Sequence, residues 1–195
     1  MTLRVPGHEW CRMAAVIAAA VAGQAWAAAQ VYAEPTAAVP HDAAPVESFE
    51  GDGVPPGWSS SDSGDVAVSR ERFKSGTKSL RWSWRGPDAT LTFVPPDGPV
   101  PFADGRSLAL WVHLDTPVEH VLRLEFLRRG ARVGQAWYVL NFRGWRPLGA
   151  PYAQVAAPSA PGGVAPTYDA IRLHAPRDVA AGLLNIDVVA LACTD

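Results

Sequence analysis

The sequence has few of the residues that form disulfides. Its 195 residues include only two cysteines, Cys11 and Cys193. Cys11 falls within the first 27 residues, which we expect to be removed as a signal peptide, so no disulfide can form within the remaining chain. We expect Cys193 to be a small buried residue of the last strand rather than a reactive thiol. A fold stapled by disulfides is therefore not expected.

Recognisable catalytic patterns are also lacking. The histidines beyond residue 27 are His41, His113, His120 and His174. None has the spacing that places two zinc ligands side by side. The sequence contains no Gly-x-Ser-x-Gly elbow, no glycine-rich phosphate loop and no cysteine beside a histidine. We therefore expect no catalytic site within this chain.

An excess of positive charge and a membrane-spanning run are missing as well. The 17 Lys and Arg residues face 19 Asp and Glu residues, a formal net charge of -2. Binding of a polyanion would thus need a local basic cluster, and we expect no nucleic-acid partner. The apolar run at residues 13–23 has about 11 residues, whereas a membrane span needs roughly 20. We expect no membrane partner.

The N-terminal 27 residues instead have the pattern of a secretory signal. Arg4 and Arg12 precede the apolar run, and the small residues Ala25 and Ala27 follow it. We expect cleavage near Ala27 and a secreted or periplasmic protein. Residues 28–45, poor in large apolar side chains and interrupted by prolines, are predicted to be a disordered leader. Residues 46–195 then form one domain.

Short runs of alternating apolar and polar residues, separated by glycine- and proline-rich turns, indicate an all-β domain. The fold predicted from the 18 prolines, 17 glycines and this spacing is a jelly-roll β-sandwich. The stretch 150–167 is predicted to be a long loop. The predicted strands are Val46–Glu50, Val66–Ser69, Ser79–Arg85, Thr90–Phe93, Ser107–Leu114, Val121–Leu127, Ala136–Phe142, Arg146–Leu148, Ala170–His174 and Leu183–Leu191.

The tryptophans fall into two groups by their place in the alternation. Trp82 and Trp84 share a strand face with Leu80, so we expect them in the core. Trp111 and His113 instead lie opposite the aliphatic stripe of their strand. Flat aromatic rings bind the C–H faces of sugars, so Trp111 is a candidate sugar platform.

Arginines supply the second element of a candidate sugar site. Arg123 lies opposite the apolar stripe of its strand, and Arg128 and Arg129 follow in the predicted turn. A guanidinium pairs with carboxylate or sulfate through two parallel hydrogen bonds. The predicted substrate-binding set is therefore Trp111, His113, Arg123, Arg128 and Arg129. The alternative is a solvated turn beside an ordinary strand.

Four segments together resemble one family, the N-terminal domain of bacterial chondroitin sulfate ABC lyases. They are "GTKSLRWSWRG", "LALWVHLDTP", "NFRGWRPLG" and "YDAIRLHAPRDVAAGLLNIDVVAL". The resemblance implies a jelly-roll domain of the galactose-binding type. It also implies acidic polysaccharide partners, namely chondroitin sulfate, dermatan sulfate or hyaluronan. In that family cleavage belongs to a following helical toroid domain, which we do not find before Asp195, so no catalytic residue is carried over.

The resemblance also implies a structural calcium ion. Its ligands would be the main-chain carbonyls of Ser48, Ser75 and Lys78 and the carboxylate of Asp187, with Glu50 as a further candidate. Hard oxygen ligands suit calcium. Asp187 lies in the apolar run "LLNIDVVAL", where an unpaired carboxylate is costly, so a cation or a strong donor is expected beside it. The alternative places Asp187 in solvent on an edge strand.

Three functions stay open at this point. The first is a non-catalytic carbohydrate-binding-like module that assists a glycosaminoglycan lyase in holding its polysaccharide. The second is a purely structural domain that packs on a catalytic partner domain and binds no sugar. The third is the N-terminal fragment of a full-length lyase whose catalytic toroid is not in this sequence.

Overall fold

The computed structural model describes residues 45–102, 106–155 and 166–193, which all fall within one compact unit. The predicted signal peptide and all but the last residue of the predicted leader lie outside these residues. Among the described residues no helix is both long and apolar enough to cross a membrane. The elements are β1 (Pro45–Glu47), β2 (Trp58–Ser60), β3 (Gly64–Ser69), β4 (Ser79–Arg85), β5 (Thr90–Phe93), β6 (Val100–Pro101), β7 (Arg106–Leu114), β8 (Val121–Arg128), β9 (Ala131–Val139), β10 (Gly144–Pro151), α2 (Tyr152–Val155), β11 (Thr167–Tyr168), β12 (Ala170–His174) and β13 (Ala181–Cys193).

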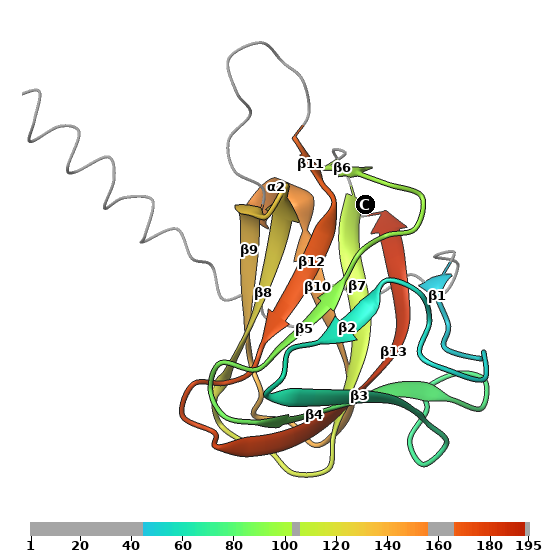
Figure 1. Cartoon of the computed structure of the whole chain (residues 1–195), viewed down its shortest axis with the longest axis vertical. Coiled ribbons are helices and arrows are strands. Elements are labelled where there is room, and N and C mark those ends of the chain that lie inside the picture. Colours follow the sequence, from blue (N-terminus) through green and yellow to red (C-terminus); the bar gives the residue numbers. More distant parts are fainter. Residues whose placement is uncertain (1–44, 103–105, 156–165, 194–195) are drawn as a thin grey trace, which may run out of the picture. The chain divides into compact units, whose positions relative to one another are not determined.

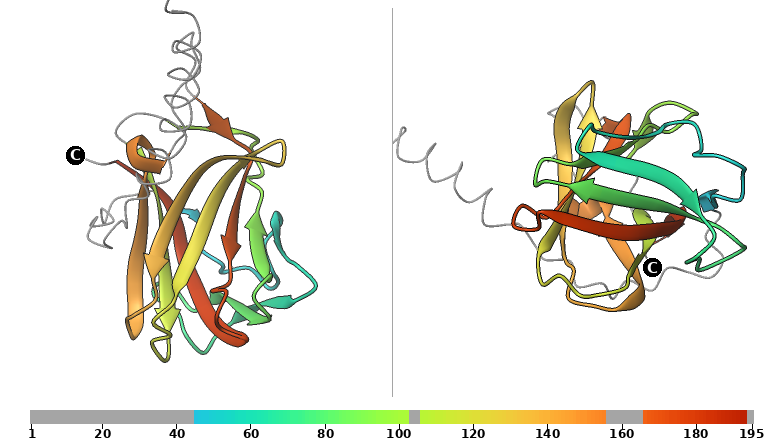
Figure 2. Two further views of the ribbon diagram at one scale, coloured as in Figure 1. Left: turned by 90° about the vertical axis from the view of Figure 1, so that its left-hand side faces the viewer. Right: turned by 60° about the horizontal axis from the view of Figure 1, so that its bottom comes forward.

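Two antiparallel sheets form the layers of a β-sandwich (Figure 1). Sheet A has the order β10-β7-β13-β4-β3, with β1 paired to β13, and sheet B has the order β2-β5-β12-β8-β9. Strands β6 and β11 form a separate two-stranded ribbon (Figure 2). The predicted all-β jelly-roll sandwich of the galactose-binding type is confirmed.

Most predicted strands are observed, and the differences lie at turns. Ser79–Arg85, Thr90–Phe93 and Ala170–His174 are confirmed to the residue, whereas the short strands β2, β6 and β11 were not predicted. The prediction Ala136–Phe142 is wrong at both ends, because β9 starts at Ala131. Arg129 and Gly130, with φ of 50° and 79°, form a two-residue hairpin turn. Because this turn is so short, β9 begins directly after it, at Ala131.

The core between the sheets contains the two tryptophans of β4. Trp82 and Trp84 are 0% and 1% exposed, which confirms the prediction that they fill the interior. The indole N–H of Trp82 donates to the Ser60 hydroxyl at 3.2 Å. Gly182 lies against Trp84 so closely that a Cβ at this position would meet the indole ring at 2.1 Å. The alternation along β4 thus places its two tryptophans in the core.

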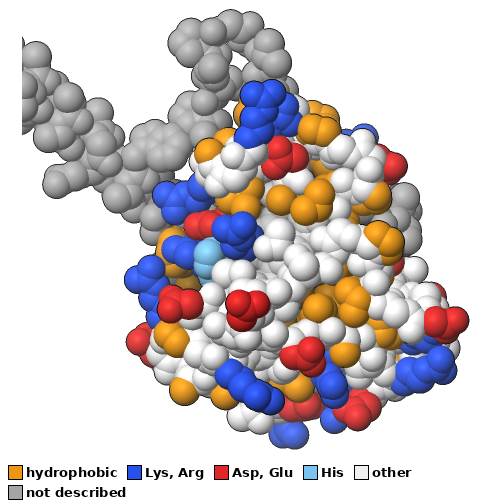
Figure 3. Space-filling view, in the orientation of Figure 1, with side chains coloured by type: hydrophobic (Ala, Val, Ile, Leu, Met, Phe, Trp, Pro, Cys, Tyr) orange, Lys and Arg blue, Asp and Glu red, His pale blue; other side chains and the backbone are white. Residues whose placement is uncertain are grey.

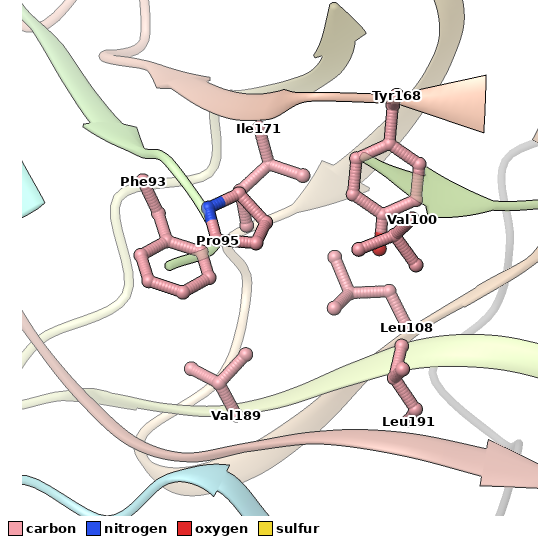
Figure 4. A pocket seen from close by; sticks show the side chains of 8 residues that line it. All are labelled: Phe93, Pro95, Val100, Leu108, Tyr168, Ile171, Val189 and Leu191. Carbon is pink, nitrogen blue, oxygen red and sulfur yellow. The ribbon is translucent and has the colours of Figure 1, made fainter. Parts of the chain in front are cut away.

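One small cavity lies between the sheets near the β6–β11 ribbon (Figure 4). It measures about 30 Å³, close to the share of a single water molecule, and its walls are almost wholly apolar. A space of this size is too small for a sugar ring. The lining residues are Phe93, Pro95, Val100, Leu108, Tyr168, Ile171, Val189 and Leu191.

Replacing Trp82 with alanine should destabilise the domain strongly. The change removes a fully buried indole and leaves a cavity, which costs about 3–5 kcal/mol in other cores. Urea unfolding followed by fluorescence measures the loss. The control Arg85→Ala, at an exposed position on the same strand, should change the unfolding free energy by less than about 0.5 kcal/mol. Equal effects of the two changes would contradict the assignment of the core.

Candidate ligand-binding face

The outer face of sheet B carries a patch of polar and aromatic side chains, which we name the polar strip. Along β5, β8, β9 and β12 buried residues alternate with more exposed ones, so one set enters the core and the other faces away from sheet A. Figure 3 shows basic and acidic side chains gathered around a histidine on the side where Figure 1 draws β8 and β9. The strip consists of Thr90, Thr92, Arg123, Glu125, Gln135, Trp137, Arg172 and His174.

Strand register arranges the strip in two rows that cross the sheet. In the first row, Arg123 of β8 lies between its partners His174 of β12 and Trp137 of β9. In the second row, Glu125 of β8 lies between Arg172 of β12 and Gln135 of β9. Cross-strand partners stand about 5 Å apart, so each row brings its side chains into contact range. The strip is therefore continuous across three strands.

His174 connects two of the charged residues of β8, Arg123 and Glu125. Its Nε2 lies 2.8 Å from Glu125 Oε2, and its Nδ1 lies 3.0 Å from Arg123 Nη2. A guanidinium only donates hydrogen bonds, so Nδ1 must be the acceptor from Arg123. Nε2 then carries the proton and donates to the Glu125 carboxylate. The two contacts together define a neutral histidine with one tautomer.

Opposing effects set the pKa values of this pair. Burial lowers the pKa of His174, as do the nearby Arg123 and Arg172 charges, while Glu125 raises it, and the net pKa lies below the ordinary value. Burial alone would raise the pKa of Glu125. The hydrogen bond from His174 and the charges of His174, Arg123 and Arg132 outweigh burial, so the pKa of Glu125 lies below its usual range. Glu125 is thus ionised at neutral pH, and His174 is uncharged.

The lowered pKa of His174 also has a consequence for stability. Because the folded protein favours the neutral ring, this contribution to stability is complete above the ordinary histidine pKa. It is lost as the pH falls through the pKa of the folded state.

Two further arginines, Arg172 of the strip and the adjacent Arg132, differ in whether they form an ion pair. Arg132 Nη1 lies 3.5 Å from Glu125 Oε1, at the same distance as Arg123 Nε. Arg172 donates from Nε to the Thr92 hydroxyl at 3.4 Å, and no ion pair among the described residues includes it. A guanidinium without an acidic partner is available to an anionic ligand.

Trp137 supplies an aromatic surface next to these charges. The Arg123 guanidinium carbon lies 5.7 Å from the centre of its ring, within the range of a cation–π contact. Within the described part of the chain, the buried Trp137 Nε1, Arg123 Nε and Gln135 Oε1 have no hydrogen-bond partner. Buried polar atoms normally find a partner. The strip therefore combines an aromatic ring with unused polar atoms.

The structure divides the predicted substrate-binding residues between two sheets. Arg123 lies in the polar strip, and Arg128 and Arg129 lie at the β8–β9 hairpin, at one end of the same sheet. Trp111 and His113 belong to β7 in sheet A. The expectation that Trp111 and an arginine of β8 share one sheet face is therefore corrected: β7 pairs with β10 and β13, whereas β8 pairs with β9 and β12.

The face around Trp111 is also partly covered by the chain itself. The Lys74 ammonium lies 4.5 Å from the centre of the Trp111 ring. His113 contacts the Trp145 ring edge to face at 5.1 Å between centroids. Arg72, from the same loop as Lys74, pairs with Asp115 at 3.1 Å. The Lys74 side chain thus lies over the Trp111 ring, where a sugar would otherwise stack.

Sequence analysis did not identify several residues of the polar strip as site residues. Trp137, Glu125, Arg172 and His174 were each part of predicted strands, but their alternation showed only that they leave the core. The pattern Ile-Arg-Leu-His at 171–174, which alternates apolar and basic residues, was the one available signal. It does not reveal that β12 lies beside β8.

Asp187 is fully buried and bonded to main-chain donors. Its Oδ2 accepts from the N–H groups of Lys74 and Ser75 at 2.6 and 2.8 Å, and its Oδ1 accepts from Val188 N–H at 2.8 Å. The alternative that Asp187 faces solvent on an edge strand is wrong, because β13 is an inner strand of sheet A and Asp187 is 0% exposed. Burial raises the pKa of Asp187, and the charge of Glu50 raises it further.

Glu50 meets the other end of the same loop. It accepts from Thr77 N–H at 3.0 Å, from the Thr77 hydroxyl at 2.8 Å and from Lys78 N–H at 3.2 Å. No group of three or more His, Cys, Asp or Glu side chains in the described ranges could hold a metal ion. The Glu50 and Asp187 carboxylates, which repel each other, are hard oxygen ligands of the kind that calcium prefers, and in this structure both accept hydrogen bonds from main-chain N–H groups of loop 74–78.

The fold is a β-sandwich similar to that of several carbohydrate-binding modules. A family 11 carbohydrate-binding module from a Clostridium thermocellum cellulase superposes with a TM-score of 0.52 at 16% identity, covering 81% of this chain and 97% of that chain. A cellulose-specific module, CBM28, gives a TM-score of 0.51 at 14% identity, with coverages of 78% and 96%. At these identities the likeness shows the fold alone.

The chain belongs to the lyase N-terminal family, whose model matches residues 43–195. It is also similar to a chondroitin sulfate ABC exolyase of Proteus vulgaris, at 26% identity over 150 residues. The match covers 74% of this chain and 14% of that enzyme. The resemblance inferred from the four sequence segments is confirmed.

Replacing Glu125 with glutamine should lower the pKa of His174 further. The change removes the negative charge that favours the imidazolium, while burial and the two arginines still oppose it. An NMR titration of the His174 ring measures the pKa in both proteins. The control Asp169→Asn, at the neighbouring hairpin, should leave it unchanged. A higher pKa of His174 in Glu125→Gln would contradict the contacts described here.

Proposed function

We propose that this chain is a non-catalytic module that binds an acidic polysaccharide along the polar strip. One observation carries the proposal: Trp137 lies beside Arg123, and Arg172 lies nearby without an acidic partner. An aromatic ring binds the apolar face of a sugar, and a guanidinium binds its carboxylate or sulfate.

The charge of the strip favours an acidic ligand. Three arginines, Arg123, Arg132 and Arg172, surround the single carboxylate of Glu125. The whole protein has a formal net charge of -2, so this cluster is the local basic region that a polyanion requires. Arg172, which no ion pair among the described residues includes, can donate to an anion that binds there.

The name of the curated relative supports chondroitin sulfate as the ligand class. The names of the structural relatives support carbohydrate binding by this fold. Because the match spans 14% of the exolyase, holding substrate for a catalytic lyase domain is part of the proposal, as is export through the N-terminal signal. The sequence gives no catalytic role to this chain itself.

A packing domain without sugar affinity is the second candidate. Two of the four exposed large apolar side chains among the described residues favour it: Phe73, in the loop over sheet A, is 44% exposed, and Leu183 of β13 is 40% exposed. They lie in loop 70–78 and in sheet A, away from the polar strip, so the two functions use different surfaces. Binding experiments on the strip therefore separate the two candidates.

Removing Arg172 should weaken glycan binding on the order of tenfold, the effect of one charged hydrogen bond. Affinity electrophoresis in gels that contain chondroitin sulfate measures the change. Trp137→Ala should weaken binding as well, through lost stacking. Trp111→Ala is the matched control, since this indole lies in sheet A and should leave mobility unchanged. Wild-type protein that is not retarded would favour the packing domain, and loss of retardation in Trp111→Ala would move the site to sheet A.

We also propose that calcium binds between loop 74–78 and β13. The residues that would hold it are Glu50 and Asp187 through their carboxylates and Ser48, Ser75 and Lys78 through main-chain carbonyls. A divalent cation there neutralises two carboxylates that otherwise repel each other.

Chelation should therefore lower the melting temperature of the wild-type protein. Asp187→Asn, which keeps the side-chain shape but removes the charge, should melt at the same temperature with and without chelator. Differential scanning fluorimetry with EDTA, and with calcium added back, measures both proteins. An unchanged wild-type melting temperature in EDTA would contradict the calcium site.

A further inference from the structure

We propose that His174 is a positioning residue that holds Arg123 while neutral and releases it to the ligand when protonated. The proposal rests on the proposed function, since it concerns the same strip. It predicts that the module binds acidic polysaccharide more tightly in mildly acidic solution than at neutral pH.

The hydrogen bonds of His174 set this behaviour. In the neutral ring, Nδ1 is an acceptor and takes a hydrogen bond from Arg123 Nη2 at 3.0 Å. Nε2 donates to Glu125 at 2.8 Å. Both ring nitrogens are therefore used, and the ring orientation is fixed from both sides.

Protonation reverses one of these contacts. An imidazolium donates from both nitrogens, so Nδ1–H would face an N–H of Arg123, and two cations would be in contact. The contact with Glu125 survives, because its carboxylate still accepts from Nε2. The hydrogen bond between His174 and Arg123 is the one that breaks, and Arg123 Nη2 is the group set free, while Arg123 Nε lies 3.5 Å from Glu125.

The charged groups around His174 support this outcome. From β8 it faces Arg123 and Glu125, and from β9 Arg132 reaches Glu125. On its own strand Arg172 adds a further positive charge. On the other side β5 contributes the uncharged Thr90. A positive charge on this histidine is therefore opposed by the arginines and balanced by one carboxylate.

Release of Arg123 changes what the strip offers to a ligand. A guanidinium freed from His174 has its paired N–H groups available for a carboxylate or sulfate. It also leaves the Trp137 ring, from whose centre it lies 5.7 Å away, and uncovers an aromatic surface. Both changes, together with the added charge of the imidazolium, favour an anionic sugar.

The test uses the full chain with chondroitin sulfate as the probe, at one pH above and one pH below the midpoint that an NMR titration gives for His174 in the folded protein, since its pKa lies below the ordinary histidine value. Ionic strength is held constant. We expect wild-type affinity to rise on the order of tenfold at the lower pH, as for one new charged hydrogen bond. His174→Gln, whose amide can donate to Glu125 and accept from Arg123, should bind like the wild type at the higher pH and show a much smaller rise. His120→Gln is the matched control and should keep the full rise.

A readout without ligand separates this proposal from the proposed function. The Trp137 indole N–H resonance should shift with pH at the midpoint measured for His174, and it should not shift in His174→Gln. An indole signal that ignores the titration of His174, or a full rise in affinity in His174→Gln, would overturn the positioning role. Absence of binding at both pH values together with a shifting indole would overturn the proposed function while supporting the link between His174 and Arg123.

Discussion

Face-to-face burial of alternating side chains is the constraint on which the other features depend. Each strand of the sandwich gives one set of residues to the space between the sheets, where Trp82 and Trp84 provide much of the volume. The same alternation forces the opposite set outward. On sheet B this outward set is polar and meets in the two rows of the polar strip. The core and the candidate ligand face are two results of one periodicity.

Electrostatics within the strip explain why it differs from an ordinary solvated sheet face. Glu125 is 8% exposed and is held ionised by His174, Arg123 and Arg132. A buried charge of this kind is tolerated only when every neighbour compensates it. The compensation fixes the side chains of the first row, while Arg172 stays outside the ion-pair network. The same face thus combines side chains held by ion pairs with Arg172, which no ion pair among the described residues includes.

The outer faces of the two sheets differ in how the chain covers them. The outer face of sheet A carries loop 70–78, which Asp187 and Glu50 hold through main-chain N–H groups and which places Lys74 over Trp111. The described part of sheet B shows no comparable loop bonded across its outer face. Among the described residues, the outer face of sheet A is therefore the one on which a loop is held by hydrogen bonds.

The sequence by itself determined most of the longer strands, the all-β class and the burial of Trp82, because these follow from alternation over a few neighbouring residues. It also placed Arg123 outside the core. Only the tertiary structure decided which outward residues meet: Arg123 and His174 are 51 positions apart and become neighbours through the pairing of β8 with β12. Trp111 failed as their partner for the same reason. Periodicity tells on which side of a strand a residue lies, whereas the sheet to which that strand belongs is set by hydrogen bonds between distant segments.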